Sequence, residues 1–310
     1  MYRPTGVMTS MVTSFKTDGS VDAAGMARNI DFQRKAGVRT IVVLGGTGEP
    51  GALSAQEREH ILEVSREAAG DDISVVASAL VGDVDVIVAD IDAAHRHGAV
   101  ACMITNPLFV RPSEDDVHRF LSDVASRSKL PLIVFNSPGR TGFTMSSSLI
   151  ERAVRDIDLL AGIKESSGDL VRFSEVRQRT RPEFACLQGN DALYLPSLAL
   201  GGDGGILAAA AAFPEHCEGI DRAMRAGDLE SARRWHYALM PAVDLLYRAS
   251  HPAPLKVAIE TRGLPAGPTR PPLYGIPEDL IESMRSTTRD VVDRIPEAVR
   301  ACRAQRYCLP

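Results

Sequence analysis

Residues 131–164 read PLIVFNSPGRTGFTMSSSLIERAVRDIDLLAGIK, and this stretch contains the unit that decides the fold. An apolar, β-branched run at 131–135 precedes an amphipathic stretch at 145–155, and a second apolar run follows at 159–164. Short apolar runs of this kind are typical of strands buried on both faces, and a helical pattern between two of them predicts a parallel β–α–β unit.

The same alternation continues in both directions along the chain. We expect strands near 6–13, 38–45, 73–79, 100–105, 131–135, 159–164, 184–188 and 204–207. We expect helices near 21–36, 54–69, 83–97, 114–127, 145–155, 169–180, 192–200 and 214–226. Eight strands in strict alternation with eight helices predict a (β/α)₈ TIM barrel of the α/β class, whereas an open doubly wound sheet requires no such number.

The helix starts are well marked, and the pattern changes after residue 227. Ser54 with Glu57 predicts a capping box, and Ser113 precedes three acidic residues in a first turn. After residue 227 only helical patterns follow, at 228–250, 252–262 and 277–306. We therefore divide the chain into a barrel domain, residues 1–227, and a C-terminal helical domain, residues 228–310.

Composition excludes several classes of function. The chain has 310 residues, 45% of them hydrophobic, and a net charge of -5, so it can bury a large core and is a poor match for nucleic acid. The apolar runs are too short to span a bilayer, and the N-terminus does not have the pattern of a signal peptide. The five cysteines lack CxxC spacing, which fits a reducing, cytoplasmic setting. They are Cys102, Cys186, Cys217, Cys302 and Cys308.

Lys164 stands out among only five lysines because it ends the buried-strand run LLAGIK. The carboxyl end of a barrel strand faces the active-site mouth, where burial lowers the pKa of an ammonium. A neutral amine there can attack a ketone. The position alone fits equally well a structural lysine that pairs with Glu165 or Asp191.

A glycine-rich loop, GGTGEPG at 45–51, follows the second expected strand. It fits GxGxxG, but Pro50 interrupts the turn and the acidic residues expected after a dinucleotide-binding unit are misplaced. We interpret it as a loop whose backbone N–H groups bind a carboxylate, with a hydroxyl added by Thr47. A tight turn without a ligand is the alternative.

Taken in order, several segments resemble the dihydrodipicolinate synthase / N-acetylneuraminate lyase family of class I aldolases and dehydratases. The segments are MVTSFKTDGSVD, AGVRTIVVLGGTGEPGALSAQERE, NPLFVRPSEDDV, LPLIVFNSPGRTG, GIKESSGD, QGND, LGGDGGI and PAPLKVAIETRGL. The resemblance implies a barrel with a helical tail that forms a homodimer or homotetramer. It also implies that a small 2-oxo acid, commonly pyruvate, is a substrate.

The resemblance also implies roles for individual residues. Lys164 would form the Schiff base, Gly46 and Thr47 would bind the substrate carboxylate, and Arg140 would face the far end of the substrate. Thr47 is also a candidate catalytic hydroxyl. Further candidate substrate-binding residues are Phe109, Phe135, Ser166, Asp191 and Ile206. Asp191 is equally well explained as a cap of the helix at 192–200.

The chain departs from the family where the family carries its proton-relay hydroxyls. Phe135 replaces the tyrosine of the fifth strand, Phe109 replaces the second tyrosine of a PYY motif, and Gly46 replaces a threonine. Because an acid–base group contributes about 10²–10⁴ in rate, another group must move protons if the site is active. The candidates are Thr47, Ser166, Ser167, Glu49, Asp191, a water molecule and the substrate carboxylate.

Three functions follow from these observations. The first is a class I lyase that makes or breaks a C–C bond next to a 2-oxo acid. The second is a Schiff-base dehydratase or hydratase-aldolase, and the third is a non-catalytic barrel that binds a 2-oxo acid. We expect no metal and no other cofactor, because the sequence contains no cluster with metal-ligand spacing and the iminium itself serves as electron sink.

Overall fold

The computed structural model describes residues 2–295 and contains a closed barrel of eight parallel strands in the order β1 to β8. The strands are β1 (Gly6–Ser10), β2 (Thr40–Val42), β3 (Ser74–Ala79), β4 (Ala101–Thr105), β5 (Leu132–Asn136), β6 (Leu160–Glu165), β7 (Ala185–Gln188) and β8 (Gly204–Leu207). β8 pairs with β1 and closes the ring. The predicted (β/α)₈ barrel is therefore confirmed.

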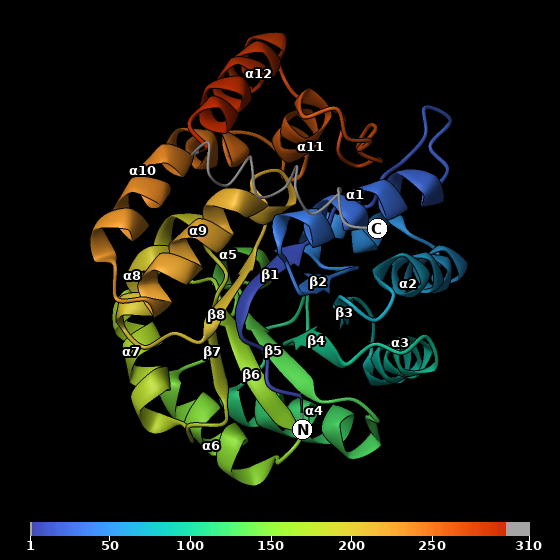
Figure 1. Ribbon diagram of the computed structural model, residues 1–310. Helices are drawn as coiled ribbons and strands as arrows, with labels where there is room; N and C mark the ends of the chain where they lie inside the picture. Colours follow the sequence, from blue (N-terminus) through green and yellow to red (C-terminus); the bar gives the residue numbers. More distant parts are fainter. Residues whose placement is uncertain (1, 296–310) are drawn as a thin grey trace.

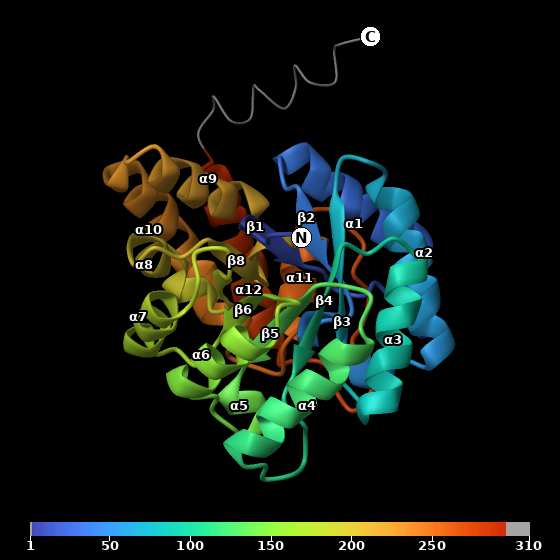
Figure 2. The same ribbon diagram turned by 90° about the horizontal axis from the view of Figure 1, so that it is seen from below.

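Helices alternate with the strands and surround them (Figure 2). They are α1 (Ala23–Ala36), α2 (Ala55–Ala69), α3 (Val84–Arg96), α4 (Glu114–Arg127), α6 (Ser147–Asp156), α7 (Leu170–Arg179), α8 (Tyr194–Ala199) and α9 (Pro214–Arg225). The side chain of Ser54 accepts a hydrogen bond from the Glu57 N–H and that of Ser113 from the Asp116 N–H, and both capping boxes are complete. These reciprocal bonds explain why the sequence marked the two starts so clearly.

Two features differ from the predicted elements. β2 is shorter than the run 38–45, because the backbone turns into a left-handed conformation at Leu44 (φ 61°). A short helix, α5 (Pro138–Thr141), was not predicted, since four residues are too few to give an amphipathic pattern. Arg140 lies on this helix.

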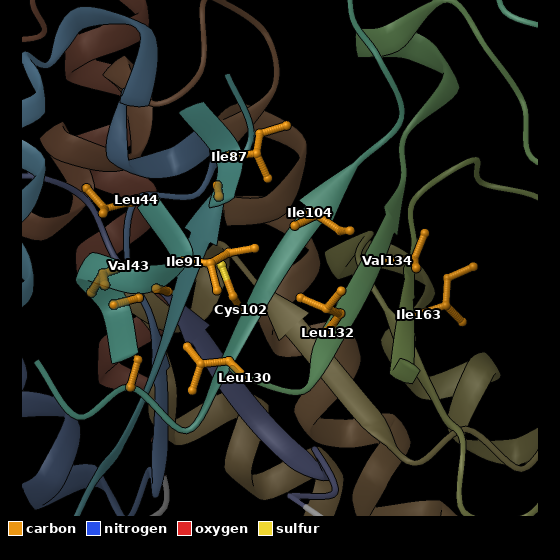
Figure 3. Packing of buried hydrophobic residues seen from close by; sticks show 14 of the residues in the cluster. Val43, Leu44, Ile87, Ile91, Cys102, Ile104, Leu130, Leu132, Val134 and Ile163 are labelled. Atoms are coloured by element: carbon orange, nitrogen blue, oxygen red, sulfur yellow. The ribbon is translucent and has the colours of Figure 1, made fainter. Parts of the chain in front are cut away.

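The core has two layers that follow the alternation along each strand. Side chains including Met8, Val42, Met103 and Ile206 fill the inside of the barrel. A larger cluster lies between the strands and the helices, where Ile91 of α3 packs towards Cys102 of β4 (Figure 3). Both layers consist of large apolar side chains, so each strand is buried on both faces.

Three further helices follow the barrel: α10 (Leu229–Leu246), α11 (Ala253–Thr261) and α12 (Glu278–Asp293). Figure 1 shows α11 and α12 beyond the end of the barrel that lies opposite the N-terminus. That end carries the carboxyl ends of the strands, because β1 runs away from the N-terminus. The predicted boundary at residue 227 stays a prediction, since α10 packs closely on α9. The last part of the predicted helix 277–306 lies outside the described residues, as do Cys302 and Cys308.

Candidate active site

The register of the barrel directs Lys164 into its mouth. Lys164 of β6 pairs with Phe135 of β5 on one side and with Leu187 of β7 on the other. Both partners belong to the cluster inside the barrel, and neighbouring residues in register point to the same side of a sheet. The side chain of Lys164 therefore points inward, and only 8% of the residue is exposed.

The surroundings of Lys164 favour the neutral amine. Its Nζ lies 4.5 Å from the centre of the Phe135 ring. Burial, opposed by the charge of Asp191 and assisted by the Arg140 guanidinium, lowers the pKa of Lys164 to about 8. An amine with this pKa is partly neutral at pH 7, as a nucleophile requires.

Neither carboxylate proposed as a structural partner contacts Lys164. Glu165 accepts hydrogen bonds from Asn136 Nδ2 and from the backbone N–H of Ser167, both at 2.7 Å. Asp191 attracts Lys164 only through space. Within residues 2–295, no carboxylate forms an ion pair with Lys164. The alternative of a structural lysine paired with Glu165 or Asp191 is therefore not supported.

A cavity of about 250 Å³ opens at the carboxyl ends of the strands, beside Lys164. It is lined by Gly46, Thr47, Phe135, Ser137, Arg140, Lys164, Ser166, Gly189, Asn190, Ile206, Ala208, Tyr247 and His251. The loops after β2, β5, β6, β7 and β8 and the segment between α10 and α11 all contribute to it. This is the place where enzymes with this fold carry their active sites.

The glycine-rich loop is held in a strained backbone conformation at the edge of the cavity. Leu44, directly before the loop, and Glu49, within it, both have left-handed backbones, with φ of 61° and 57°. The hydroxyl of Thr13 donates to the carbonyl oxygen of Gly48 at 2.7 Å, and Lys256 forms an ion pair with Glu49 at 2.7 Å. A left-handed residue with a side chain costs about 1–2 kcal/mol, so these contacts are needed to hold the loop.

Gly189 leaves room for functional side chains, and Gly46 lies in ordinary contact distance of Arg140. A Cβ atom on Gly189 would lie 1.9 Å from Ser166 Oγ and 2.9 Å from Lys164 Cε. A Cβ atom on Gly46 would lie 3.7 Å from the guanidinium carbon of Arg140. Arg140 thus reaches back over the glycine-rich loop, and any larger residue at 189 would displace the lysine.

Most of the candidate residues chosen from the sequence meet at this cavity. The exceptions are Asp191 and Phe109. Asp191 is buried directly behind the lining, where it accepts hydrogen bonds from the Tyr247 hydroxyl at 2.5 Å and the Ala209 backbone N–H at 3.0 Å. The Phe109 side chain is fully exposed on the loop after β4, with φ of 62°, and does not line the cavity.

Six residues of the lining were not among the predicted site residues: Ser137, Gly189, Asn190, Ala208, Tyr247 and His251. Two of them, Tyr247 and His251, carry titratable side chains. Tyr247 ends α10, and His251 lies between α10 and α11. Their rings are stacked, with centroids 5.3 Å apart and planes at 17°. His251 Nε2 lies 3.1 Å from Thr47 Oγ1. The only sign of these two residues in the sequence was a tyrosine and a histidine four positions apart at the end of an expected helix.

The comparisons with known proteins agree with this geometry. The model of the Dihydrodipicolinate synthetase family matches residues 3–290. A 4-hydroxy-tetrahydrodipicolinate synthase of Archaeoglobus fulgidus is 35% identical over 286 residues, which cover 92% of this chain and 98% of the relative. The protein of the same name from Methanoculleus marisnigri is 33% identical over 283 residues, with 90% and 97% covered. The crystal structure of dihydrodipicolinate synthase from Aquifex aeolicus has a TM-score of 0.90 at 27% identity, covering 94% of this chain and 99% of its own.

Proposed function

The chain belongs to the dihydrodipicolinate synthetase family of carbon–carbon lyases, and we propose that it forms a Schiff base between Lys164 and a 2-oxo acid. In this proposal it makes or breaks a C–C bond next to the 2-oxo group, with pyruvate as the shared substrate or product. The observation that carries the proposal is a buried lysine at the mouth of a barrel that forms no ion pair with a carboxylate of the described residues.

The reaction begins when the neutral amine of Lys164 attacks C2 of the 2-oxo acid. Loss of water gives an iminium, which withdraws electrons and stabilises the carbanion left at C3 as an enamine. Thr47 and the backbone of Gly46 bind the C1 carboxylate. Arg140, whose guanidinium lies over the same loop, binds an acidic group on the distal part of the substrate through its planar fork of donors.

A dehydratase or hydratase-aldolase is the second candidate. It uses the same enamine to expel a hydroxyl group and needs the same lysine. The observation that favours it is the loss of family hydroxyls at Gly46, Phe109 and Phe135, while Lys164 and Thr47 remain. For the same reason we propose that the chain does not catalyse the reaction for which its relatives are named at a useful rate.

Borohydride trapping tests the proposed function. Incubation with pyruvate and borohydride is expected to add the mass of a reduced pyruvyl group to the peptide that holds Lys164. If Lys164→Ala is labelled equally well, or if wild type is not labelled by any 2-oxo acid, the proposal is wrong. Analysis of the products from a panel of 4-hydroxy-2-oxo acids then separates the candidates. The lyase releases pyruvate, the dehydratase loses water with the carbon chain intact, and a hydratase-aldolase gives both products.

We further propose that the protein assembles as a homodimer or homotetramer and acts in a reducing compartment. In support, Phe109 and its neighbour Val110 are exposed apolar residues on one loop, and Cys102, Cys186 and Cys217 are free thiols. No helix in the described part of the chain is long and apolar enough to cross a membrane. Light scattering measures the mass of the assembly.

A further inference from the structure

Tyr247 brings a phenol to the cavity that Lys164 lines, whereas β5 carries Phe135. We propose that Tyr247, paired with Asp191, moves the protons of the Schiff-base reaction in place of the phenol that β5 lacks. This inference rests on the proposed function of Lys164. The phenol is supplied by the end of α10, a helix outside the eight β–α units of the barrel.

The hydroxyl of Tyr247 is held in place by Asp191, and the residue lines the cavity that holds Lys164. It donates to Asp191 Oδ2 at 2.5 Å, and Asp191 Oδ1 accepts from the backbone N–H of Ala209 at 3.0 Å. Tyr247 and Lys164 line the same cavity. A phenol that is anchored on one side and open to the cavity on the other is placed to act on a bound substrate.

His251 fixes the plane of the Tyr247 ring. It stacks on that ring, and its Nε2 lies 3.1 Å from Thr47 Oγ1, which in turn accepts from the Ser10 hydroxyl at 3.0 Å. Burial, together with the positive charges of Arg140 and Lys164, lowers the pKa of His251 to about 3. The imidazole is therefore neutral at pH 7, so we assign it as a positioning residue and not as the acid.

The other candidate groups are occupied or lie elsewhere. Glu49 pairs with Lys256 at 2.7 Å, and its second carboxylate oxygen accepts from the Arg270 backbone N–H at 2.9 Å. Ser167 accepts from the backbone N–H of Asp169 and does not line the cavity. Thr47 Oγ1 lines the cavity but is bonded to the Ser10 hydroxyl and to His251 Nε2. Ser166 is then the remaining side-chain competitor, because its buried Oγ has no hydrogen-bond partner among the described residues.

The protons balance over the steps from the 2-oxo acid to the enamine. Attack of the amine forms the N–C2 bond as the carbonyl π pair moves to oxygen, and Tyr247 relays one proton from nitrogen to that oxygen. The phenol then protonates the hydroxyl, the C2–O bond breaks, and water leaves as the nitrogen lone pair forms the iminium. The phenolate takes a proton from C3, and the C3–H pair becomes the enamine double bond. Burial and the Asp191 carboxylate raise the pKa of Tyr247, and the positive charge of Arg140 opposes that shift and so favours the phenolate.

Exchange of the methyl protons of pyruvate for deuterium tests this assignment without knowledge of the full substrate. The rate constant, followed by proton NMR in D₂O, reports both iminium formation and proton transfer at C3. Tyr247→Phe keeps the stacked ring and is expected to lower the enzymatic rate constant by about 10²–10⁴. The amount of adduct trapped by borohydride at equilibrium should be retained. Tyr237→Phe, on the exposed side of the same helix, is the matched control and should exchange like wild type.

A rescue experiment separates a chemical role from a structural one. The double variant Tyr247→Phe/Phe135→Tyr puts a phenol on β5, next to Lys164, and should recover at least about tenfold of the lost rate. A structural defect at residue 247 would not respond to this change. If Tyr247→Phe does not fold, Asp191→Asn tests the same pair, and it should slow exchange while adduct still forms.

The outcomes distinguish this inference from the proposed function. Wild type that forms no adduct and catalyses no exchange overturns both. Wild type that exchanges, with Tyr247→Phe equally fast, overturns the inference alone. The same holds if Ser166→Ala, and not Tyr247→Phe, abolishes exchange, or if the double variant recovers nothing.

Discussion

Two buried lysines, Lys164 and Lys256, show how one side chain serves two purposes in this chain. Lys164 is 8% exposed and Lys256 is 3% exposed. Each ammonium lies over a phenylalanine ring, 4.5 Å from the centre of Phe135 for Lys164 and 4.4 Å from that of Phe15 for Lys256. Burial lowers the pKa of both.

Their polar partners are the difference. Lys256 lies 2.7 Å from Glu49 and donates to the carbonyl oxygen of Pro268 at 2.8 Å. Lys164 has no comparable partner among residues 2–295. A buried cation that is paired is costly to remove, because its partner is left as an uncompensated charge, whereas an unpaired one gives up its proton readily. The comparison therefore favours a structural role for Lys256 and supports the proposed role of Lys164 as the nucleophile.

Lys164→Met should produce the largest effect, which is loss of all enzymatic proton exchange and of the borohydride adduct. Stability should rise. The pKa of Lys164 falls from 10.5 to about 8 on folding, so the cation destabilises the folded state by about 3 kcal/mol below pH 8. This cost disappears as pH rises towards the unfolded value. Urea unfolding at pH 7 measures the gain, and a loss of stability would mean that Lys164 has a structural partner.

Lys256→Met should lower stability and leave the adduct at Lys164 intact. Removing one member of a buried ion pair costs about 3–5 kcal/mol, because Glu49 is left as an uncompensated charge. The free energy of unfolding should fall by this amount, while Lys164 still traps pyruvate in the folded fraction. The double variant Lys256→Met/Glu49→Gln removes the stranded charge and should recover part of the stability. Equal stability of Lys256→Met and wild type would break the comparison.

The sequence predicted the setting of Lys164 but not that of Lys256. Lys164 ended an apolar strand, and periodicity alone placed it at the barrel mouth. Nothing in the sequence pointed to the buried setting of Lys256: its partner Glu49 lies 207 positions away in the chain, on a loop whose fold depends on long-range contacts. Local pattern predicts on which face of an element a residue lies, but not which distant group it meets.

The same limit explains what else was found and missed. Strands, helices and capping boxes are local and followed from spacing, and Gly46, Thr47, Phe135, Arg140 and Ser166 followed from the family motifs. Tyr247 and His251 match no motif, because they come from the helical extension that folds back over the barrel. Phe109 stands in a motif that the chain shares with the family, but its side chain does not line the cavity.

Arg140→Lys tests the positive group that helps to keep Lys164 neutral. The substitution keeps the charge and loses the planar fork, so the KM for the full substrate should rise about 10- to 100-fold, as for one hydrogen bond to a charged group. Trapping of pyruvate at Lys164 should change little. Steady-state kinetics and adduct mass measure the two effects. A parallel loss of both would point to a structural role for Arg140.

The pH dependence of exchange sharpens the assignment of Lys164. Only the neutral amine attacks, so the rate should rise with pH and level off above the pKa of about 8. About a tenth of the amine is neutral at pH 7 and about nine tenths at pH 9, which predicts a roughly tenfold rise. A lysine with its ordinary pKa would instead give a rise of about 100-fold that continues beyond pH 9.

Phe135→Tyr and Phe15→Tyr form a matched pair, since each adds a hydroxyl to the ring beneath one of the two lysines. An unpaired buried hydroxyl costs about 1–3 kcal/mol, so both variants should lose some stability. Exchange and pyruvate release should be unchanged or slightly lower in both. In wild type Tyr247 already supplies a phenol, so a second one beside Lys164 adds no proton route.

A different result at residue 135 would change the interpretation of the whole cavity. If the chain is a decayed family enzyme in which nothing replaced the lost tyrosine, Phe135→Tyr should raise turnover of an ordinary 4-hydroxy-2-oxo acid by about 10²–10⁴. Phe15→Tyr should give no such gain, because Lys256 remains paired with Glu49. Rates of pyruvate release for the two variants across the same substrates therefore decide between a retuned site and a decayed one. A gain confined to residue 135 would also remove the need for Tyr247 as the acid–base group.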